Sequence, residues 1–370
     1  MPAGTMLGGS RGRPERASPV GHAAGPDGSR RDTEGGLMHP GRRLSIGLVG
    51  AIAAAGVLAG CGEAGSSGTE APRQAASGAG CAPVAGQQLI ALEDDKALQH
   101  ADNVIPAVHG KVVTPQLIAA LDKVSAVLDT PKLVLLNKAV DDDRKSAQAA
   151  AQEFAAANGL TDGVERGPGG RLTVGAGNFT ESEIIAQLYK IQLTAAGYQV
   201  TVQQIGNREL YEPALEKGEI QVVPEYAATL AEFLRGKVNS GGQPVSSPDV
   251  DATVTALRGL GEKVGLAFGA PAAAQSQNAF AVTEEFAEKY GVRTLSELAE
   301  KCSGTATVLG GPPECQQRPF CKPGLEQTYG LEVGSFSSLD QGGPLTKTGL
   351  RNGEVSVGLV FSTDAAYAQS

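Results

Sequence analysis

The chain has 370 residues, a formal net charge of −9, 50 glycines, 21 prolines and no tryptophan. This length permits two domains with a large core. The acidic balance argues against a nucleic-acid partner, because phosphates require a basic face.

The amino-terminal part has the pattern of an exported protein. Residues 1–37 are rich in Gly, Pro and Arg without apolar periodicity, so we expect a disordered extension or a misassigned start. Residues 38–60 combine a positive segment with an apolar one that is too short for a comfortable membrane span, as in a signal peptide. Leu58–Cys61 matches the bacterial lipoprotein cleavage motif, which predicts lipidation of Cys61. The alternative is an ordinary apolar helix that ends in a cysteine. Residues 61–86 would be a flexible tether.

Two short apolar segments and three helices follow the tether. Residues 89–92 are a predicted strand, and residues 104–108 are a second one that Pro106 should break. Thr114-Pro115 and Thr130-Pro131 each have the pattern of an N-cap followed by the first helical residue. Residues 161–170 then form a linker without predicted structure.

The stretch from residue 171 to 234 alternates between strands and helices. The predicted strands are residues 172–174, 200–202 and 220–223, and the predicted helices are residues 180–195 and 208–217. Thr180 and Glu183 fit a capping box at the start of the first of these helices. Alternation of this kind predicts a parallel, doubly wound sheet. Ligands bind beyond the carboxyl ends of such strands, here at residues 176–180 and 224–229.

Three motifs in this stretch carry a resemblance. They are Gly177–Glu181, Arg208–Glu216 and Pro224–Tyr226, in this order. Together they resemble the substrate-binding proteins of osmoprotectant importers, the glycine betaine, choline and carnitine family. The resemblance extends over most of the chain after Gln87.

The resemblance implies a fold and a set of partners. It implies the two-lobed α/β fold of type II periplasmic binding proteins, in which each lobe has a doubly wound, mostly parallel sheet and the ligand lies between the lobes. The partners would be a small-molecule solute and the permease and ATPase subunits of an ABC importer. The protein would be a monomer without a cofactor on the extracytoplasmic face of the cell membrane, attached only through its lipid.

The order of segments departs from the family pattern. The segment that begins at Leu92-Glu-Asp-Asp-Lys96, with the helices after it, normally ends members of this family. Its place ahead of the core indicates a circular permutation, with residues 161–170 as the join. We therefore expect a continuous first lobe at residues 87–265, a second lobe at residues 266–370, and one crossing between them near Gly265.

Several residues are candidates for contact with a solute. Tyr226 could hold a quaternary ammonium by cation–π attraction, or could simply pack at a strand end. The resemblance implies that Thr229 binds the solute's carboxylate or hydroxyl group. The remaining candidates are Asn178, Phe179, Thr180, Asp102, Asn278, Phe361 and Asp364, together with Asp94 and Asp95 as acids that either face the cleft or lie in solvent.

Some positions differ from those of glycine betaine binders. Asp102 and Asn278 stand where such relatives have tyrosines, Phe361 stands at a third such position, and Ser182 replaces a glutamine. The solute therefore stays open among glycine betaine, choline, carnitine, ergothioneine and another zwitterion such as an amino acid.

The cysteines suit an oxidising compartment. Without Cys61, four remain and allow three pairings. We favour Cys315–Cys321, a short loop closure, which leaves Cys81–Cys302. A zinc site is the rival, but no histidine lies near this cluster.

Two other classes of function fit this sequence less well. An exported enzyme would need a nucleophile with a base or a metal cluster, and only His100 and His109 follow Cys61, so we predict no catalytic residues and no metal site. A ligand-sensing subunit would share the fold, but would normally be fused to a membrane span and a signalling domain.

Overall fold

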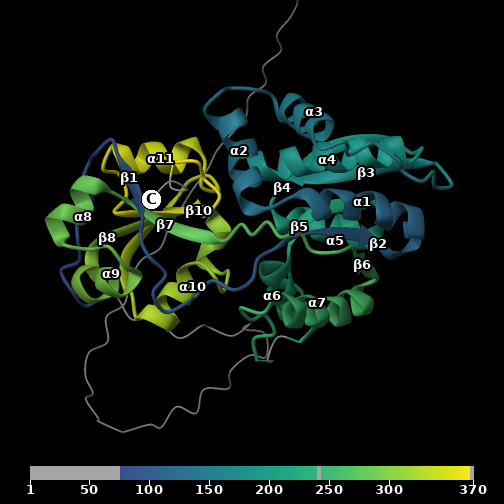
Figure 1. The fold of residues 1–370 in the computed structure, drawn as a ribbon. Coiled ribbons are helices and arrows are strands. Elements are labelled where there is room, and N and C mark those ends of the chain that lie inside the picture. The colour runs from purple at the N-terminus through teal and green to yellow at the C-terminus, as the bar shows by residue number, and fades with distance from the viewer. Residues whose placement is uncertain (1–75, 240–242, 367–370) are drawn as a thin grey trace, which may run out of the picture. The chain divides into compact units, whose positions relative to one another are not determined.

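The structure is a computed structural model that describes residues 76–239 and 243–366 (Figure 1). The expected extension, the signal segment, the lipidated Cys61 and most of the tether lie outside these residues. The described chain forms two five-stranded sheets, each with helices packed on both faces. This confirms the prediction of a two-lobed α/β fold.

The two sheets share one pattern of strand directions. The first has the order β4-β3-β5-β2-β6 and the second the order β9-β8-β10-β7-β1. In each sheet one inner strand, β2 or β7, is antiparallel to its two neighbours, and the other strands are parallel to one another. The strands of the first sheet are β2 (Val104–His109), β3 (Arg171–Gly177), β4 (Gln199–Gly206), β5 (Val222–Tyr226) and β6 (Leu266–Phe268). Those of the second are β1 (Leu89–Ala91), β7 (Asn278–Thr283), β8 (Gly304–Gly311), β9 (Val333–Ser338) and β10 (Val357–Phe361).

Alternating residues of the inner strands pack into two separate cores in the first lobe. On β2, Val104 and Val108 pack into the core under α1 to α4, whereas Ile105 and Ala107 pack into the core under α5 to α7. This alternation follows from the two-residue period of a strand, and it explains why both faces of the sheet are covered. The helices of this lobe are α1 (Pro115–Val127), α2 (Thr130–Asp141), α3 (Ala147–Ala157), α4 (Thr180–Ala195), α5 (Arg208–Lys217), α6 (Ala227–Val238) and α7 (Val250–Val264), with the short turn η1 (Gly110–Val112).

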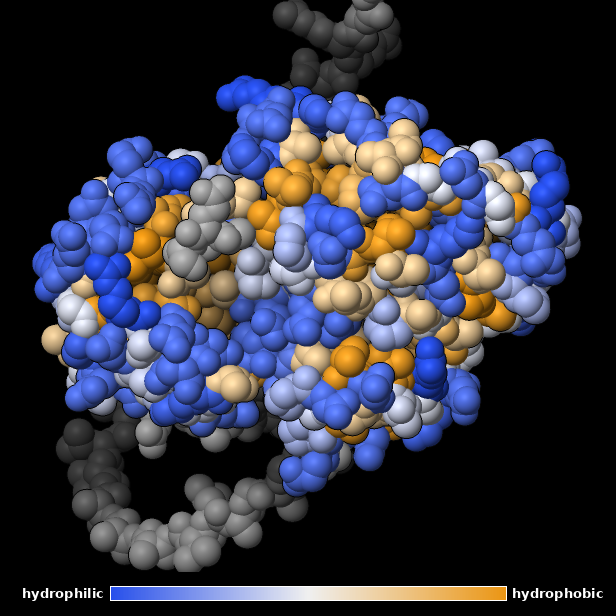
Figure 2. All heavy atoms as spheres, viewed as in Figure 1, coloured by the Kyte–Doolittle hydropathy of each residue, from blue (hydrophilic) through white to orange (hydrophobic). Residues whose placement is uncertain are grey.

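The second lobe repeats this arrangement with shorter helices. On β7, Phe280 and Val282 belong to one core, whereas Ala281 belongs to the opposite one, which α11 covers. The elements of this lobe are α8 (Glu284–Tyr290), α9 (Leu295–Cys302), α10 (Lys322–Gly324) and α11 (Pro344–Arg351), with the short turns η2 (Pro313–Gln316) and η3 (Leu325–Tyr329). On the face seen in Figure 2, hydrophilic residues make up most of the outer rim, as expected for helices that turn their apolar sides inward. Within the described residues, no helix is both long and apolar enough to cross a membrane.

Capping and stop residues in the sequence predicted the helices well, except for the first residue of two helices. The α5 helix has the predicted bounds and ends at Gly218, whose φ of 75° lies in the left-handed region that glycine tolerates. The predicted N-cap Thr130 is instead the first residue of α2, because the carboxylate of Asp129 accepts the Lys132 N–H at 2.9 Å. Thr180 likewise is the first helical residue of α4 rather than its cap.

The expected break of β2 at its proline is wrong. Pro106 lies directly opposite Pro224 of β5 in the antiparallel register. Because neither proline has an N–H group, both missing donors fall at the same pair, and the ladder continues on either side.

The predicted lobe boundaries need correction, because two strands belong to the other sheet. β1 pairs with β7 in the second sheet, and β6 pairs with β2 in the first. The first lobe therefore consists of residues from about 102 to 275, and the second of the residues before and after this range. The chain crosses between the lobes twice rather than once near Gly265.

The two crossings lie side by side. Asn103 forms an isolated antiparallel bridge with Gln275, and the Ser276 N–H donates to the Asp102 carbonyl oxygen at 3.1 Å. We call residues 101–103 and 274–277 the hinge strands. They place Asp102 and Ser276 between the lobes.

Both disulfides belong to the second lobe. Cys81 is bonded to Cys302 and Cys315 to Cys321, with sequence separations of 221 and 6 residues. This is the pairing that the sequence favoured. The first of these bonds ties the segment before β1 to the end of α9.

Candidate functional site

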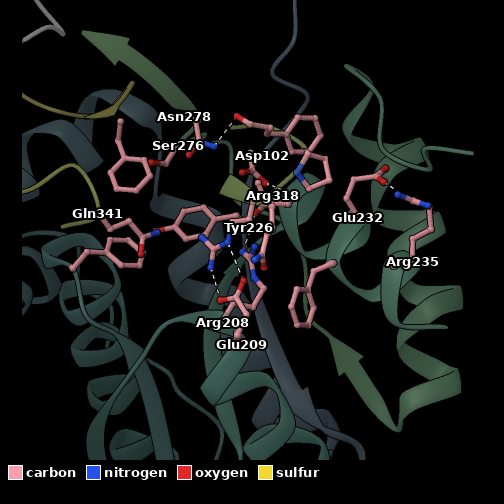
Figure 3. Close-up of a pocket in the computed structure, with 18 residues that line it drawn as sticks. Asp102, Arg208, Glu209, Tyr226, Glu232, Arg235, Ser276, Asn278, Arg318 and Gln341 are labelled. Carbon is pink, nitrogen blue, oxygen red and sulfur yellow. Dashed lines mark hydrogen bonds and ion pairs between the residues drawn. The ribbon is translucent and has the colours of Figure 1, made fainter. Parts of the chain in front are cut away.

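A cavity of about 400 Å³ lies between the two lobes, next to the hinge strands (Figure 3). Strand ends from both sheets reach it: Tyr226 ends β5, Asn278 begins the antiparallel β7 and Phe361 ends β10. This is the sheet edge at which ligands bind in doubly wound folds. Its volume is in the range of small-molecule sites.

Aromatic rings supply much of the cavity's apolar surface. The five that line it are Phe179, Tyr226, Phe233, Phe320 and Phe361. The ring centroid of Phe179 lies 6.2 Å from that of Tyr226 and 5.5 Å from that of Phe361. Aromatic faces attract quaternary ammonium groups, so the cavity offers such a group surfaces from both lobes.

The hydroxyl group of Tyr226 is committed to the protein. It donates to Glu181 Oε1 at 2.6 Å, and the Tyr226 N–H donates to Glu225 Oε2 at 3.1 Å. Burial, followed by the nearby Glu181, raises the pKa of Tyr226 well above its ordinary value, so the hydroxyl stays a protonated donor. The ring of Tyr226, rather than its hydroxyl, is what a solute can use.

Three side chains donate hydrogen bonds to the buried carboxylate of Glu181. Besides Tyr226, Asn137 Nδ2 and Thr363 Oγ1 each donate to Glu181 Oε2 at 2.7 Å. Thr363 follows β10 of the second lobe, whereas the other members belong to the first. These four residues, the Glu181 cluster, therefore join the lobes beside the aromatic rings.

A buried ion pair lies on the first-lobe side of the cavity. Arg208 Nη2 lies 2.6 Å from Glu225 Oε2, Arg208 Nε also contacts this carboxylate, and both side chains are buried. The same Nη2 donates to Thr229 Oγ1 at 2.8 Å. Arg208 is thus held by a carboxylate and a hydroxyl group, which fixes the floor of the cavity.

Two further arginines that line the cavity also have glutamate partners. Arg318 of the second lobe donates to both carboxylate oxygens of Glu209 on α5, at 3.1 and 2.8 Å, and so links the lobes at the cavity. Arg235 Nε donates to Glu232 Oε2 at 2.6 Å within α6. Figure 3 shows these pairs around the cavity.

Asp102 differs from the other charged residues of the lining. It is 5% exposed, and its Oδ1 accepts the Thr229 N–H in the first turn of α6 at 2.9 Å. Burial raises the pKa of Asp102 to about 7, although the hydrogen bond from Thr229 and the charge of Arg208 act in the opposite direction. A nearby cation would favour the ionised form of this group.

The structure brings most of the sequence candidates together. Tyr226, Thr229, Phe179, Asp102, Asn278 and Phe361 all line the cavity. Asn178, Thr180 and Asp364 line a smaller cavity instead, and Phe179 and Phe361 border both cavities. The Thr180 hydroxyl donates to Asp141 at 2.7 Å, and Asp364 forms an ion pair with Lys347. Asp94 accepts N–H groups of its own loop, and the Asp95 carboxylate accepts the Ser296 N–H at the second lobe's surface.

Sequence reasoning missed several residues of the site. Arg318 and Glu232 were not candidates, and Glu181, Arg208 and Glu225 entered only as parts of motifs. An arginine at a helix start and a glutamate at a strand end would have been a signal, because both positions lie at the carboxyl edge of one sheet. Phe320 had no such signal, since it lies in the disulfide-closed loop before α10.

Several polar groups of the cavity lining are hydrogen-bonded to protein side chains or backbone, and five aromatic rings line it. Across residues 76–239 and 243–366, no group of three or more His, Cys, Asp or Glu side chains could hold a metal ion.

Similarity to known proteins points to one family. The family model described as the substrate-binding domain of an ABC-type glycine betaine transport system matches residues 83–157 and 170–370. A glycine-betaine-binding protein of Pseudomonas aeruginosa is 28% identical over 202 residues, which cover 52% of this chain and 62% of that protein. The chain thus spans less than two thirds of the length of this relative.

Proposed function

The chain belongs to the family of substrate-binding domains of ABC-type glycine betaine transport systems, and on this premise we propose that it captures a small compatible solute with a quaternary ammonium group. The observation that carries this proposal is the cavity between the lobes, with five aromatic rings and a buried carboxylate in its lining. Aromatic faces and an acid together attract a cationic head group such as a quaternary ammonium.

We propose further that the chain delivers this solute to the permease and ATPase of an ABC importer. It would do so as a monomer on the extracytoplasmic face of the cell membrane, anchored by lipid at Cys61. The lipoprotein motif and the two disulfides support an exported location. The matching family is a substrate-binding domain of a transport system rather than an enzyme class.

A screen by thermal unfolding tests the solute class. Glycine betaine, choline, carnitine, ergothioneine and amino acids are added one at a time to the purified protein. A solute at 100 times its Kd should stabilise the fold by about 2.7 kcal/mol. Stabilisation by ergothioneine or an amino acid alone would favour the alternative of another zwitterion. Deletion of the genes for the proposed permease and ATPase, followed by growth with the solute, distinguishes transport from ligand sensing. Loss of solute-dependent growth would favour transport.

The anchor has its own test. Replacing Cys61 by alanine should move the protein from the membrane to the soluble fraction, because its lipid would be lost. Retention at the membrane without lipid would contradict the motif. Deletion of residues 1–37 should leave export unchanged.

We also propose that the chain is a circular permutant of the family order. The match to the family model falls into two segments that flank residues 158–169, and no helix or strand lies in residues 161–170. Opening this linker while joining Ser370 to Gln87 through a short Gly/Ser bridge should preserve solute binding. Loss of folding at every bridge length would count against a permutation.

A further inference from the structure

One wall of the cavity is a single loop of the second lobe. Gln317, Arg318, Pro319 and Phe320 are consecutive in the chain, and all four line the cavity. Most of the other lining residues belong to helices or strands, whose backbone hydrogen bonds hold them in place. No helix or strand includes residues 317–321. The backbone of this wall therefore lacks the regular support that most of the cavity has.

A disulfide closes this loop at both ends. Cys315 lies in η2 and Cys321 directly precedes α10, and the bonded pair is separated by 6 residues. Both cysteines are buried in the core of the second lobe. We call residues 315–321 the disulfide loop. Its four lining residues lie between the two cysteines, so the bond anchors both ends of the cavity wall to the core.

The bond contributes less to the stability of the fold than the other disulfide does. A disulfide restricts the unfolded chain more when it closes a longer loop. Cys81 and Cys302 are 221 residues apart, whereas Cys315 and Cys321 are 6 apart. The main physical consequence of the short disulfide is therefore local, because it limits the conformations of the few residues that it encloses.

The enclosed residues contact both lobes. Arg318 donates to the two carboxylate oxygens of Glu209 on α5, at 3.1 and 2.8 Å, and Figure 3 shows this pair at the cavity. The Phe320 carbonyl oxygen accepts Asn278 Nδ2 at 3.1 Å and Gln99 Nε2 at 3.0 Å. A shift of the disulfide loop would thus displace an aromatic ring of the lining together with an ion pair that joins the lobes.

On the basis of the proposed function, we propose that Cys315 and Cys321 are positioning residues for solute capture. Their disulfide holds Arg318 and Phe320 in the arrangement of the closed cavity before the solute arrives. Without the bond, the solute would have to order the loop as it binds, and the lost conformational entropy would lower the affinity. Because several residues are involved, we expect a loss of about tenfold or more in affinity.

Affinity and stability distinguish the two disulfides. Calorimetry on the full mature chain uses glycine betaine and choline as probes. The variant Cys315→Ala/Cys321→Ala should bind the tighter probe about tenfold or more weakly than the wild type. The matched control Cys81→Ala/Cys302→Ala should bind it as the wild type does, although its urea midpoint falls further. Wild-type affinity in the Cys315→Ala/Cys321→Ala protein would overturn the inference.

A second control applies if the loss of the longer disulfide prevents folding. Leu298 of α9 is buried in the same core but lies outside the cavity lining. Leu298→Ala should lower the urea midpoint through the cavity that it leaves in the core, without a change in affinity. An affinity loss as large as that of Cys315→Ala/Cys321→Ala would mean that destabilisation alone weakens binding, which would also overturn the inference.

A double-mutant cycle tests whether the bond acts through the cavity wall. Phe320→Leu keeps an apolar side chain and removes the aromatic face. Its cost in affinity should be smaller in the Cys315→Ala/Cys321→Ala background than in the wild type, because a loop without its disulfide already presents the ring poorly. Equal costs in the two backgrounds would contradict a positioning role.

Hydrogen exchange provides a readout in the unliganded protein. The N–H of residue 321 donates to the Arg318 carbonyl oxygen at 3.0 Å, and the Arg318 N–H donates to the Glu314 carbonyl oxygen at 3.1 Å. Both amides should exchange about tenfold or more faster in Cys315→Ala/Cys321→Ala, and the bound probe should slow them again. Exchange at the wild-type rate would show that the loop is ordered without its disulfide.

Two failures remain distinguishable. If the wild type binds neither probe, the proposed function is contradicted and this inference falls with it. If the wild type binds a probe and Cys315→Ala/Cys321→Ala binds it equally well, the proposed function stands and the inference alone is wrong.

Discussion

The two lobes have the same strand pattern but are stabilised in different ways. In the first lobe, charged groups lie inside: Arg208, Glu225 and Glu181 are all buried, and its described residues form no disulfide. The second lobe holds both disulfides, and Lys322, at 9% exposed, is the only buried charged side chain among its described residues. The comparison teaches that one fold plan can be stabilised in two ways, with buried charge concentrated in the first lobe and disulfides in the second.

The disulfides give the largest expected effect. Replacing Cys81 and Cys302 by alanine should lower the free energy of unfolding by about 5 kcal/mol, because this bond closes a loop that contains the whole first lobe. Replacing Cys315 and Cys321 should cost only about 2 kcal/mol, since their loop is short. Urea denaturation under non-reducing conditions measures both. Equal losses would show that loop size does not set the difference.

The next largest effect concerns the buried ion pair of the first lobe. Arg208→Met should lower the free energy of unfolding by about 3–5 kcal/mol, because Glu225 is left buried without a cation. The control is Arg293→Met in the second lobe, whose pair with Glu284 is more exposed, at 54% and 28%, and should cost less than about 1 kcal/mol. Similar values for the two variants would contradict the contrast between the lobes.

Tyr226 should affect binding and stability separately. Tyr226→Ala should weaken binding of the best solute by about 1.5–3 kcal/mol, as measured by calorimetry, through lost cation–π attraction and contact area. Tyr226→Phe keeps the ring, so affinity should change little, but Glu181 loses one of its donors and the free energy of unfolding should fall by about 1–3 kcal/mol. Unchanged affinity in a folded Tyr226→Ala protein would assign Tyr226 to packing.

The smallest effect is expected at the contact between the lobes. Arg318→Met removes the two hydrogen bonds to Glu209, and these side chains are 21% and 39% exposed. Such a pair contributes about 0.2–1 kcal/mol, so solute affinity should fall by no more than about fivefold, with a smaller difference at high salt. A loss beyond tenfold would mean that this pair contacts the solute directly.

The sequence predicted local elements more reliably than the assignment of strands to sheets. The bounds of α5 followed from periodicity and from Gly218, both of which act within a few residues. β1 belongs to the second sheet because it pairs with β7, which lies nearly 200 residues later in the chain. Three apolar residues in a row do not indicate which strand they will pair with. The lobe boundaries were therefore wrong although most strands were found.

The candidate site shows the same division. Tyr226 and Phe361 were found because strand ends and a family resemblance point to single positions. The Arg208–Glu225 pair and the Glu181 cluster were not found, because a pairing is a property of two distant segments. Only the fold shows that the arginines of the cavity are already matched and that Asp102 is not.

The paired hinge strands set the kind of motion that the lobes can make. If a single segment connected the lobes, rotation about its backbone bonds would let the lobes both bend and twist. Two strands held together at Asn103 and Gln275 resist twist, because twist would pull this bridge apart, and they still permit bending. This pairing therefore favours bending of the lobes about one axis over twisting, and such bending would change the distance between the rings of Phe361 and Tyr226.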